Sequence, residues 1–181
     1  RRSVTLTALR RFLDTRGYLE IESPITLPIP GGANARPFVT HHHALDMQLY
    51  LRVAQELAIK RCLVGGFERV YELNRKFRNE GLSTQHNPEF TMLEYNETYL
   101  DYVDYMNFTE EMLREVAREV TGSLKVSYQG KTVDFGKSFA RIGLPDAVVQ
   151  YYDGLSVSDC SDADKLRSAF NSLLPSVCRA R

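Results

Sequence analysis

The segments that decide the fold are RVYELNRKFRNE (residues 69–80) and HNPEFTMLEY (residues 86–95). We interpret them as two antiparallel strands joined by a long loop. The loop chemistry comes from Gly81, Ser83, Asn87 and Pro88, which are residue types that favour turns. The strands predict a rigid sheet on which side chains are held in fixed positions.

Side chains on a strand alternate between its two faces. Arg78 and Glu80 are therefore expected on one face, and Phe90, Met92 and Glu94 on one face of the returning strand. If both faces point the same way, they form one pocket. Its guanidinium can hold a phosphate, its aromatic ring can stack on a base, and a deep carboxylate suits an ammonium group. The alternative is an ordinary hairpin with a surface ion pair.

Composition is that of a globular chain with no strong charge bias. The 181 residues are 43% hydrophobic and 25% charged, with a formal net charge of zero. Nothing in this balance indicates nucleic-acid binding by charge alone. No apolar run approaches the roughly 20 residues of a membrane span, and the N-terminus lacks the apolar core of a signal peptide. The three cysteines are expected to be reduced thiols in a cytoplasmic protein, and they are Cys62, Cys160 and Cys178.

The same hairpin carries a resemblance to a known family. Phe-Arg-x-Glu at residues 77–80, then His86, then Phe-x-x-x-Glu at residues 90–94 resemble the second signature motif of class II aminoacyl-tRNA synthetases, in the lysyl version. The resemblance implies an α+β fold with an antiparallel sheet flanked by helices. It extends over residues 1–142, expected to be a partial catalytic core, and residues 143–181 are expected to form a helical segment of uncertain role.

The resemblance also implies roles for single residues. Arg78 matches the arginine that contacts the α-phosphate and the amino-acid carboxylate, and His86 matches the residue that reaches the γ-phosphate. These two are the expected catalytic residues. Glu80 lies where the family holds the adenine amino group, and Phe90 where a ring lies under adenine. The full set expected to bind ATP is Arg78, Glu80, His86, Asn87 and Phe90.

The set expected to bind lysine is Gly32, Glu56, Arg78, Glu94 and Asn96. By resemblance, Glu56 binds the α-ammonium and Glu94 lies in the side-chain pocket. Two positions depart from the family. Asn96 stands where a tyrosine is common, which puts the affinity for lysine in doubt, because asparagine is shorter. Gln55 replaces the usual proline or threonine.

The N-terminal segment predicts an amphipathic helix over residues 2–16, ended by Gly17, and a strand over residues 18–22. The expected apolar stripe of the helix is Val4, Ala8, Leu9, Phe12 and Leu13. This pair resembles the first class II motif, which implies a homodimer through residues 1–25. The alternative is simply a helix packed on a strand.

The remaining elements are predicted from pattern. Residues 24–37 are rich in proline and glycine and predict a shaped loop. We expect a strand over 48–53, a helix over 54–64, a hairpin over 125–135 and helices over 144–152 and 163–174, with Asp162 as N-cap. The helix over 101–121 is expected to have a capping box from Asp101 and Asp104 and a buried stripe of Tyr105, Met112, Val116 and Val120, with Leu113 beside the stripe. Consecutive histidines on a strand point to opposite faces, so His41, His42 and His43 predict no metal site.

The function implied by the resemblance is a lysine–tRNA ligase, which activates lysine with ATP and transfers it to tRNA-Lys. The third motif and the carboxylates for Mg²⁺ are absent, so the main magnesium ligands are expected outside this chain. We read the chain as the front half of a catalytic domain, either a fragment or a truncated relative. Two alternatives are a lysyl transferase that acts on a translation factor and a non-catalytic module that dimerises or binds a ligand.

Overall fold

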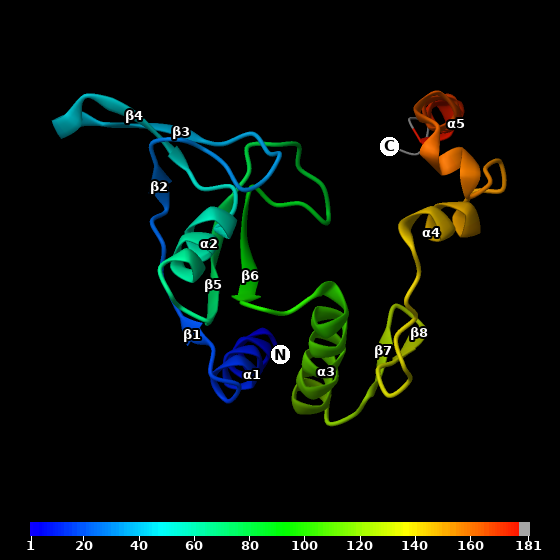
Figure 1. Ribbon diagram of the computed structural model, residues 1–181, viewed down its shortest axis with the longest axis horizontal. Coiled ribbons are helices and arrows are strands. Elements are labelled where there is room, and N and C mark those ends of the chain that lie inside the picture. Colours follow the sequence, from blue (N-terminus) through cyan, green and yellow to red (C-terminus); the bar gives the residue numbers. More distant parts are fainter. Residues whose placement is uncertain (178–181) are drawn as a thin grey trace. The chain divides into compact units, whose positions relative to one another are not determined.

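The computed structural model describes residues 1–177, with side chains as far as residue 172. The chain divides into two compact units, Arg1–Gly136 and Lys137–Arg181. Figure 1 labels their helices and strands. The first unit contains every residue that the sequence places in the site.

A three-stranded sheet forms the centre of the first unit. Its strand order is β1 (Leu19–Glu20), β5 (Arg69–Phe77) and β6 (Glu89–Glu97). Strands β5 and β6 are antiparallel, as predicted, with pairs running from Arg69↔Glu97 to Phe77↔Glu89. Strand β1 pairs with β5 in parallel, so the expectation of a purely antiparallel sheet is wrong at this edge. A long crossover between the two strands permits the parallel pairing.

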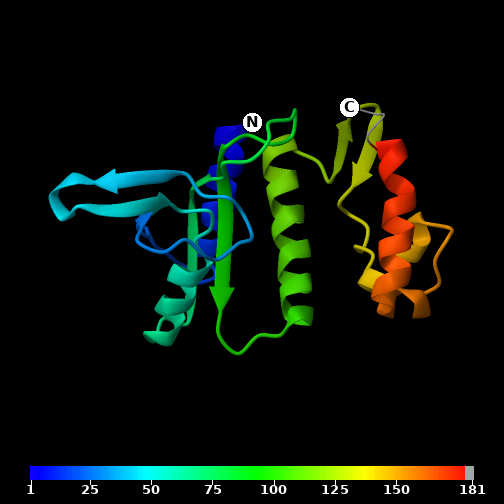
Figure 2. The same cartoon turned by 90° about the horizontal axis from the view of Figure 1, so that it is seen from above.

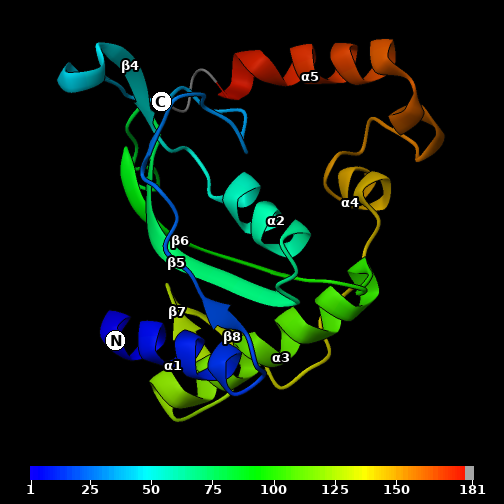
Figure 3. The ribbon, with the colours of Figure 1, turned by 60° about the vertical axis from the view of Figure 1, so that its left-hand side comes forward.

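The apolar core lies on one face of this sheet. Helices α1 (Arg2–Asp14) and α3 (Tyr102–Thr121) cover that face, and α2 (Glu56–Val64) covers the other (Figure 3). The core is built from Phe12, Leu13, Tyr18, Tyr71 and Met112, with Leu73, Leu93, Tyr95 and Phe108 packed around them. Edge-to-face and tilted ring contacts join the aromatic residues of this cluster.

Helix α1 ends two residues earlier than predicted, and Gly17 takes the expected left-handed conformation at φ 78°. Its buried residues are Ala8, Phe12 and Leu13, whereas Val4 is 44% exposed. The predicted stripe is therefore right for the last two turns and wrong for Val4.

Helix α3 begins with the predicted capping box. Asp101 Oδ1 accepts from the backbone N–H of Val103 (2.7 Å) and Asp104 (3.0 Å), and Gly122 ends the helix at φ 75°. Leu113, predicted to lie beside the buried stripe, is exposed, whereas Met112 is buried as predicted. Phe108, outside the predicted stripe, packs on the core.

A second sheet has the order β2 (Thr26–Leu27), β4 (Met47–Leu51) and β3 (Val39–His42). The β3–β4 hairpin, closed by a 3₁₀ turn η1 (His43–Leu45), extends away from α1 and α3 (Figure 2). Strands β7 (Lys125–Tyr128) and β8 (Lys131–Asp134) form the predicted hairpin. Its turn residues Gln129 and Gly130 both have positive φ, as a two-residue hairpin turn requires.

The second unit contains α4 (Leu144–Tyr151), a 3₁₀ turn η2 (Ser158–Ser161) and α5 (Ala163–Val177). Both helices were predicted, and Asp162 caps α5 by accepting from the N–H of Asp164 (3.0 Å) and Lys165 (3.2 Å). In the described part of the chain, no helix is long and apolar enough to cross a membrane. Cys62 and Cys160 are free thiols, and Cys178 lies outside the described residues.

Candidate active site

The side chains of the site come from one face of the β5–β6 hairpin. Cross-strand partners share a face, and the partners include Glu72↔Glu94 and Lys76↔Phe90. The opposite face carries Tyr71 and Leu73 and packs on the core. We call the first of these the α2 face, and it is formed by Val70, Glu72, Asn74, Lys76, Phe90, Met92, Glu94 and Asn96. The predicted grouping of Phe90, Met92 and Glu94 is therefore right.

A pocket of about 190 Å³ lies where the hairpin ends. It brings together all five residues expected to bind ATP, and its lining is Arg78, Glu80, Gly81, Gln85, His86, Asn87 and Phe90. The Cζ atom of Arg78 lies 5.3 Å from the centroid of the Phe90 ring. A guanidinium beside an aromatic face suits a ligand that combines phosphate with a flat base.

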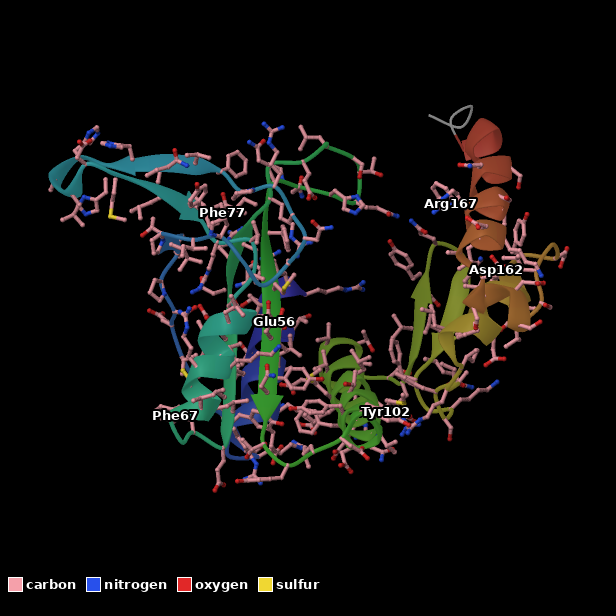
Figure 4. The ribbon with its side chains drawn as sticks, turned by 45° about the horizontal axis from the view of Figure 1, so that its top comes forward. Glu56, Phe67, Phe77, Tyr102, Asp162 and Arg167 are labelled. Carbon is pink, nitrogen blue, oxygen red and sulfur yellow. The ribbon has the colours of Figure 1, made fainter. Side chains whose placement is uncertain are left out.

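Arg78 and Glu80 reach the pocket from a loop and not from a strand. Strand β5 ends at Phe77, which Figure 4 labels, so the expectation that strand alternation places them is wrong. Hydrogen bonds to neighbouring segments replace the sheet ladder. The Arg78 N–H donates to the Pro88 carbonyl (2.8 Å), and its Nε donates to the Val53 carbonyl (3.4 Å). These bonds fix the direction of the guanidinium.

His86 is held by a local turn. The Ser83 and His86 backbones exchange N–H···O=C bonds of 3.2 and 3.3 Å. The Ser83 hydroxyl lies 2.8 Å from His86 Nδ1. The imidazole is exposed at the mouth of the pocket, as Glu80 is, so both are accessible to a ligand.

The residues expected to bind lysine gather at the start of α2. The Gln55 N–H donates to Glu94 Oε1 at 3.4 Å. Gly32 has φ 87°, and a Cβ there would lie 3.2 Å from the Ala54 Cβ and 3.5 Å from the Glu56 Cβ. Figure 4 shows Glu56 on α2, the helix that lies over the hairpin. Glycine thus permits the loop to approach the helix start closely.

Glu56 forms an ion pair with Lys60 at 2.5 Å, one helical turn away, and the two side chains are 42% and 55% exposed. Asn96 follows Glu94 by two residues on the α2 face and is half-buried. Two residues of strand span roughly 7 Å. The geometry therefore places Asn96 next to Glu94 but away from the pocket of Arg78.

Beneath these residues lies a buried ion pair. Arg52 Nη1 and Glu72 Oε1 are 2.7 Å apart, and both side chains are 1% exposed. Ser23 joins the pair, since its hydroxyl donates to Glu72 Oε2 (2.6 Å) and its carbonyl accepts from Arg52 (3.0 Å). Burial alone would raise the pKa of Glu72, but the hydrogen bonds from Ser23 and Arg52 lower it below its usual value.

Lys76 is fully buried on the same face. Its Nζ has no hydrogen-bond partner among the residues that the structure describes. Burial lowers the pKa of Lys76 to about 8, the Arg52 guanidinium acts in the same direction, and Glu72 and Glu94 oppose it. Burial raises the pKa of Glu94, and the charge on Lys76 acts against this rise. Lys76 is thus an internal cation within electrostatic range of Glu94.

The sequence matches the family model of tRNA synthetases class II (D, K and N) over residues 1–172. The chain belongs to this family. It is 54% identical over 167 residues to a lysine–tRNA ligase of Thioalkalivibrio sulfidiphilus, with 92% of this chain and 34% of that protein covered. A lysine–tRNA ligase of Chromohalobacter salexigens is 55% identical over 92% of this chain and 33% of its own length. A lysine–tRNA ligase of Thiobacillus denitrificans is 51% identical over 96% of this chain and 34% of its own. The chain therefore spans about a third of the length of these relatives.

The second unit of this class II synthetase chain has a larger, open hollow of about 610 Å³. It contains none of the predicted site residues. Its charged side chains are paired, Asp159 with Lys165 and Asp164 with Arg167. The hollow offers no free charge among these residues to bind a nucleotide.

No three His, Cys, Asp or Glu side chains in the described ranges come together to hold a metal ion. The expectation that the main magnesium ligands lie outside this chain stays a prediction.

Sequence reasoning missed the buried charges beneath the site. The sequence did contain a signal for them. Lys76 follows Glu72 by four residues and so lies on the same face of β5, and their cross-strand partners Phe90 and Glu94 were already predicted to line the pocket. A lysine on a strand face that a helix covers indicates either a functional side chain or one whose burial reduces the stability of the fold. The missing information was the depth of burial, which only the packing of distant segments decides.

Proposed function

We propose that this chain supplies the ATP pocket and part of the lysine pocket of a lysine–tRNA ligase. The main observation behind this proposal is that one pocket is lined by Arg78, Glu80, His86, Asn87 and Phe90. Family membership and relatives that bear the ligase name support the same reaction. Because the chain spans about a third of those relatives, the complete reaction is proposed for the whole protein.

ATP would lie with its adenine on the ring of Phe90. The Arg78 guanidinium, whose Cζ lies 5.3 Å from the centroid of that ring, would bind the α-phosphate, and His86 at the mouth would bind the γ-phosphate. Glu80 can accept a hydrogen bond from the adenine amino group, and Asn87 can donate or accept beside it.

Lysine would lie between the start of α2 and strand β6. Glu56 would bind the α-ammonium, with the Gly32 backbone close by, and Glu94 would face the side-chain ammonium. Asn96 extends this pocket on the same strand face. Arg78 would contact the amino-acid carboxylate and so join the two substrates.

In the first step a carboxylate oxygen of lysine attacks the α-phosphorus of ATP. The new P–O bond forms as the bond to pyrophosphate breaks, which gives lysyl-adenylate. No protein nucleophile is required, so the contribution of the chain is to hold both substrates in line and to place positive charge at the reacting phosphate. We assign to Arg78 the task of placing positive charge at the reacting phosphate.

In the second step a hydroxyl at the 3′ end of tRNA-Lys attacks the carbonyl carbon of the adenylate. The acyl bond to AMP breaks, and lysine is transferred. Magnesium would neutralise phosphate charge during the first step, with its protein ligands outside the described residues.

A homodimer through residues 1–25 belongs to the same proposal. Val4 is 44% exposed and Leu19 is 48% exposed, although both are large and apolar. Apolar residues left uncovered near α1 and β1 are suited to cover each other in a second copy.

The test is lysine-dependent exchange of pyrophosphate into ATP, together with calorimetric binding of ATP, in the chain and in Arg78→Ala. The matched control is Arg75→Ala, because Arg75 is an exposed arginine on the other face of β5. We expect Arg78→Ala to weaken ATP binding at least about tenfold, the loss of a charged hydrogen bond, and Arg75→Ala to leave it unchanged. A folded chain that binds neither ATP nor lysine contradicts the proposal. Binding of ATP without exchange is the result expected of a partial site, and the exchange reaction then belongs to the whole protein.

A further inference from the structure

We propose that Gln55 is a positioning residue that sets the length of the diamino acid accepted by this site. It fixes the start of α2, which carries Glu56, against the part of the hairpin that carries Glu94. This inference rests on the proposed function, in which Glu56 binds the α-ammonium of lysine and Glu94 binds the side-chain ammonium.

Gln55 is hydrogen-bonded to the hairpin at two points. Its side chain is buried, and Nε2 donates to the Glu72 carbonyl at 2.6 Å. Its backbone N–H donates to Glu94 Oε1 at 3.4 Å. Because Glu72 and Glu94 are cross-strand partners, both hydrogen bonds join Gln55 to the same position along β5 and β6.

Gln55 is also joined firmly to Glu56. It is the N-cap of α2, and its carbonyl accepts from the backbone N–H of Ala58 (3.0 Å) and Ile59 (3.1 Å). Glu56 is the next residue and the first of the helix. Because these hydrogen bonds make the first turn rigid, a shift of Gln55 relative to the hairpin would move the backbone of Glu56 with it.

Stability of the fold does not account for the amide of Gln55. Its Oε1 is buried and has no hydrogen-bond partner among the residues that the structure describes. A buried acceptor without a partner reduces stability, and an apolar side chain that only filled this space would avoid the loss. The amide is therefore better explained by what its Nε2 holds in place.

The separation of two carboxylates selects the length of a substrate that carries two ammonium groups. If Glu56 and Glu94 are held at a fixed separation, only a side chain of matching length lets both ammonium groups bind at once. A shorter diamino acid could reach both carboxylates only if the start of α2 moved toward β6. The two hydrogen bonds of Gln55 to the hairpin oppose that movement.

The experiment compares L-lysine with L-ornithine, which has the same two ammonium groups and a side chain that is one methylene shorter. Calorimetric dissociation constants would be measured for the chain and for Gln55→Met, which keeps the length of the side chain and removes the Nε2 donor. The control is Gln48→Met, since Gln48 is an exposed glutamine of β4 whose Nε2 donates to the Tyr50 hydroxyl at 2.5 Å. The quantity compared is the ratio of the two constants, because a general loss of structure weakens the binding of both amino acids alike.

We expect the chain to bind lysine at least about tenfold more tightly than ornithine, and Gln55→Met to reduce this ratio to less than about threefold, since one methylene is worth about tenfold or more only in a fixed pocket. Gln48→Met should leave the ratio unchanged. If Gln55→Met does not fold, as judged by circular dichroism, Gln55→Asn tests the same ratio. Asparagine is a favoured N-cap, but its side chain is too short to reach the Glu72 carbonyl from the same backbone position.

Two outcomes overturn the inference and leave the proposed function standing. One is a ratio that keeps its original value in a folded Gln55 variant, which would show that Gln55 is only structural. The other is an unmodified chain that binds lysine and ornithine equally well. A folded chain that binds neither amino acid overturns the proposed lysine site, and the inference fails with it.

Discussion

Lys76 is a single residue whose burial makes the stability of the fold depend on pH. Its pKa is lowered to about 8 in the fold, from 10.5 for a free side chain. Between these values the unfolded chain binds the extra proton, so the free energy of unfolding rises with pH. We expect a rise of about 2 kcal/mol from pH 7.5 to 9.5, measured by urea denaturation.

Two tyrosines set the upper limit of the pH range over which stability rises. Burial, together with hydrogen bonds to carboxylates, raises the pKa of Tyr18 and Tyr71 well above the usual value of 10. Above pH 10 the unfolded chain therefore loses protons that the fold keeps, and stability falls again. Lys76→Met should abolish the rise and keep the fall. A rise of equal size in Lys76→Met would show that another group causes it.

The Arg52–Glu72 ion pair is a second feature in which a single residue strongly affects the stability of the fold. Both side chains are 1% exposed, so removing one partner leaves a buried charge without its counter-ion. We expect Glu72→Gln to lower the free energy of unfolding by about 3 kcal/mol or more. The surface pair Arg16–Glu111 is the comparison, and Glu111→Gln should cost less than about 1 kcal/mol. Equal losses in urea denaturation would show that burial does not set the strength of the first pair.

At the scale of elements, the end of α3 is defined by one glycine. Gly122 has φ 75°, and a Cβ there would meet nothing within 4 Å. Gly122→Ala therefore strains only the backbone, and we expect it to destabilise the fold by about 1 kcal/mol. Gly81 is the matched control, since it also has open space but no positive φ, so Gly81→Ala should change stability little. The comparison is made by thermal or urea unfolding, and equal losses would exclude the backbone explanation.

At the scale of the whole molecule, the exposed apolar residues near α1 predict association. We expect sedimentation equilibrium to give twice the chain mass of 20.7 kDa at micromolar concentration. Val4→Asp, which places a charge in the proposed interface, should return the chain to one copy, because burying an unpaired carboxylate is costly. Val133→Asp changes another exposed valine, outside residues 1–25, and should leave the mass doubled. A single-copy mass for the unmodified chain would contradict the dimer.

The sequence by itself determined what depends on local pattern. The two long strands, the capping box of α3, the glycine ends of α1 and α3, and the turn at Gln129 follow from alternation and from residues with special backbone preferences. The grouping of Arg78, His86 and Phe90 also followed, because the spacing of these residues resembles that of a known family motif.

Only the tertiary structure decided what depends on contacts between distant segments. The parallel pairing of β1, the exposure of Leu113 and the loop position of Arg78 follow from how the crossover, α1 and the Pro88 carbonyl meet the sheet. The internal charge balance belongs here too. Lys76 becomes a buried cation only when distant segments pack over its end of the hairpin and remove water. The free energy of a charge depends on those surroundings and not on its position in the sequence.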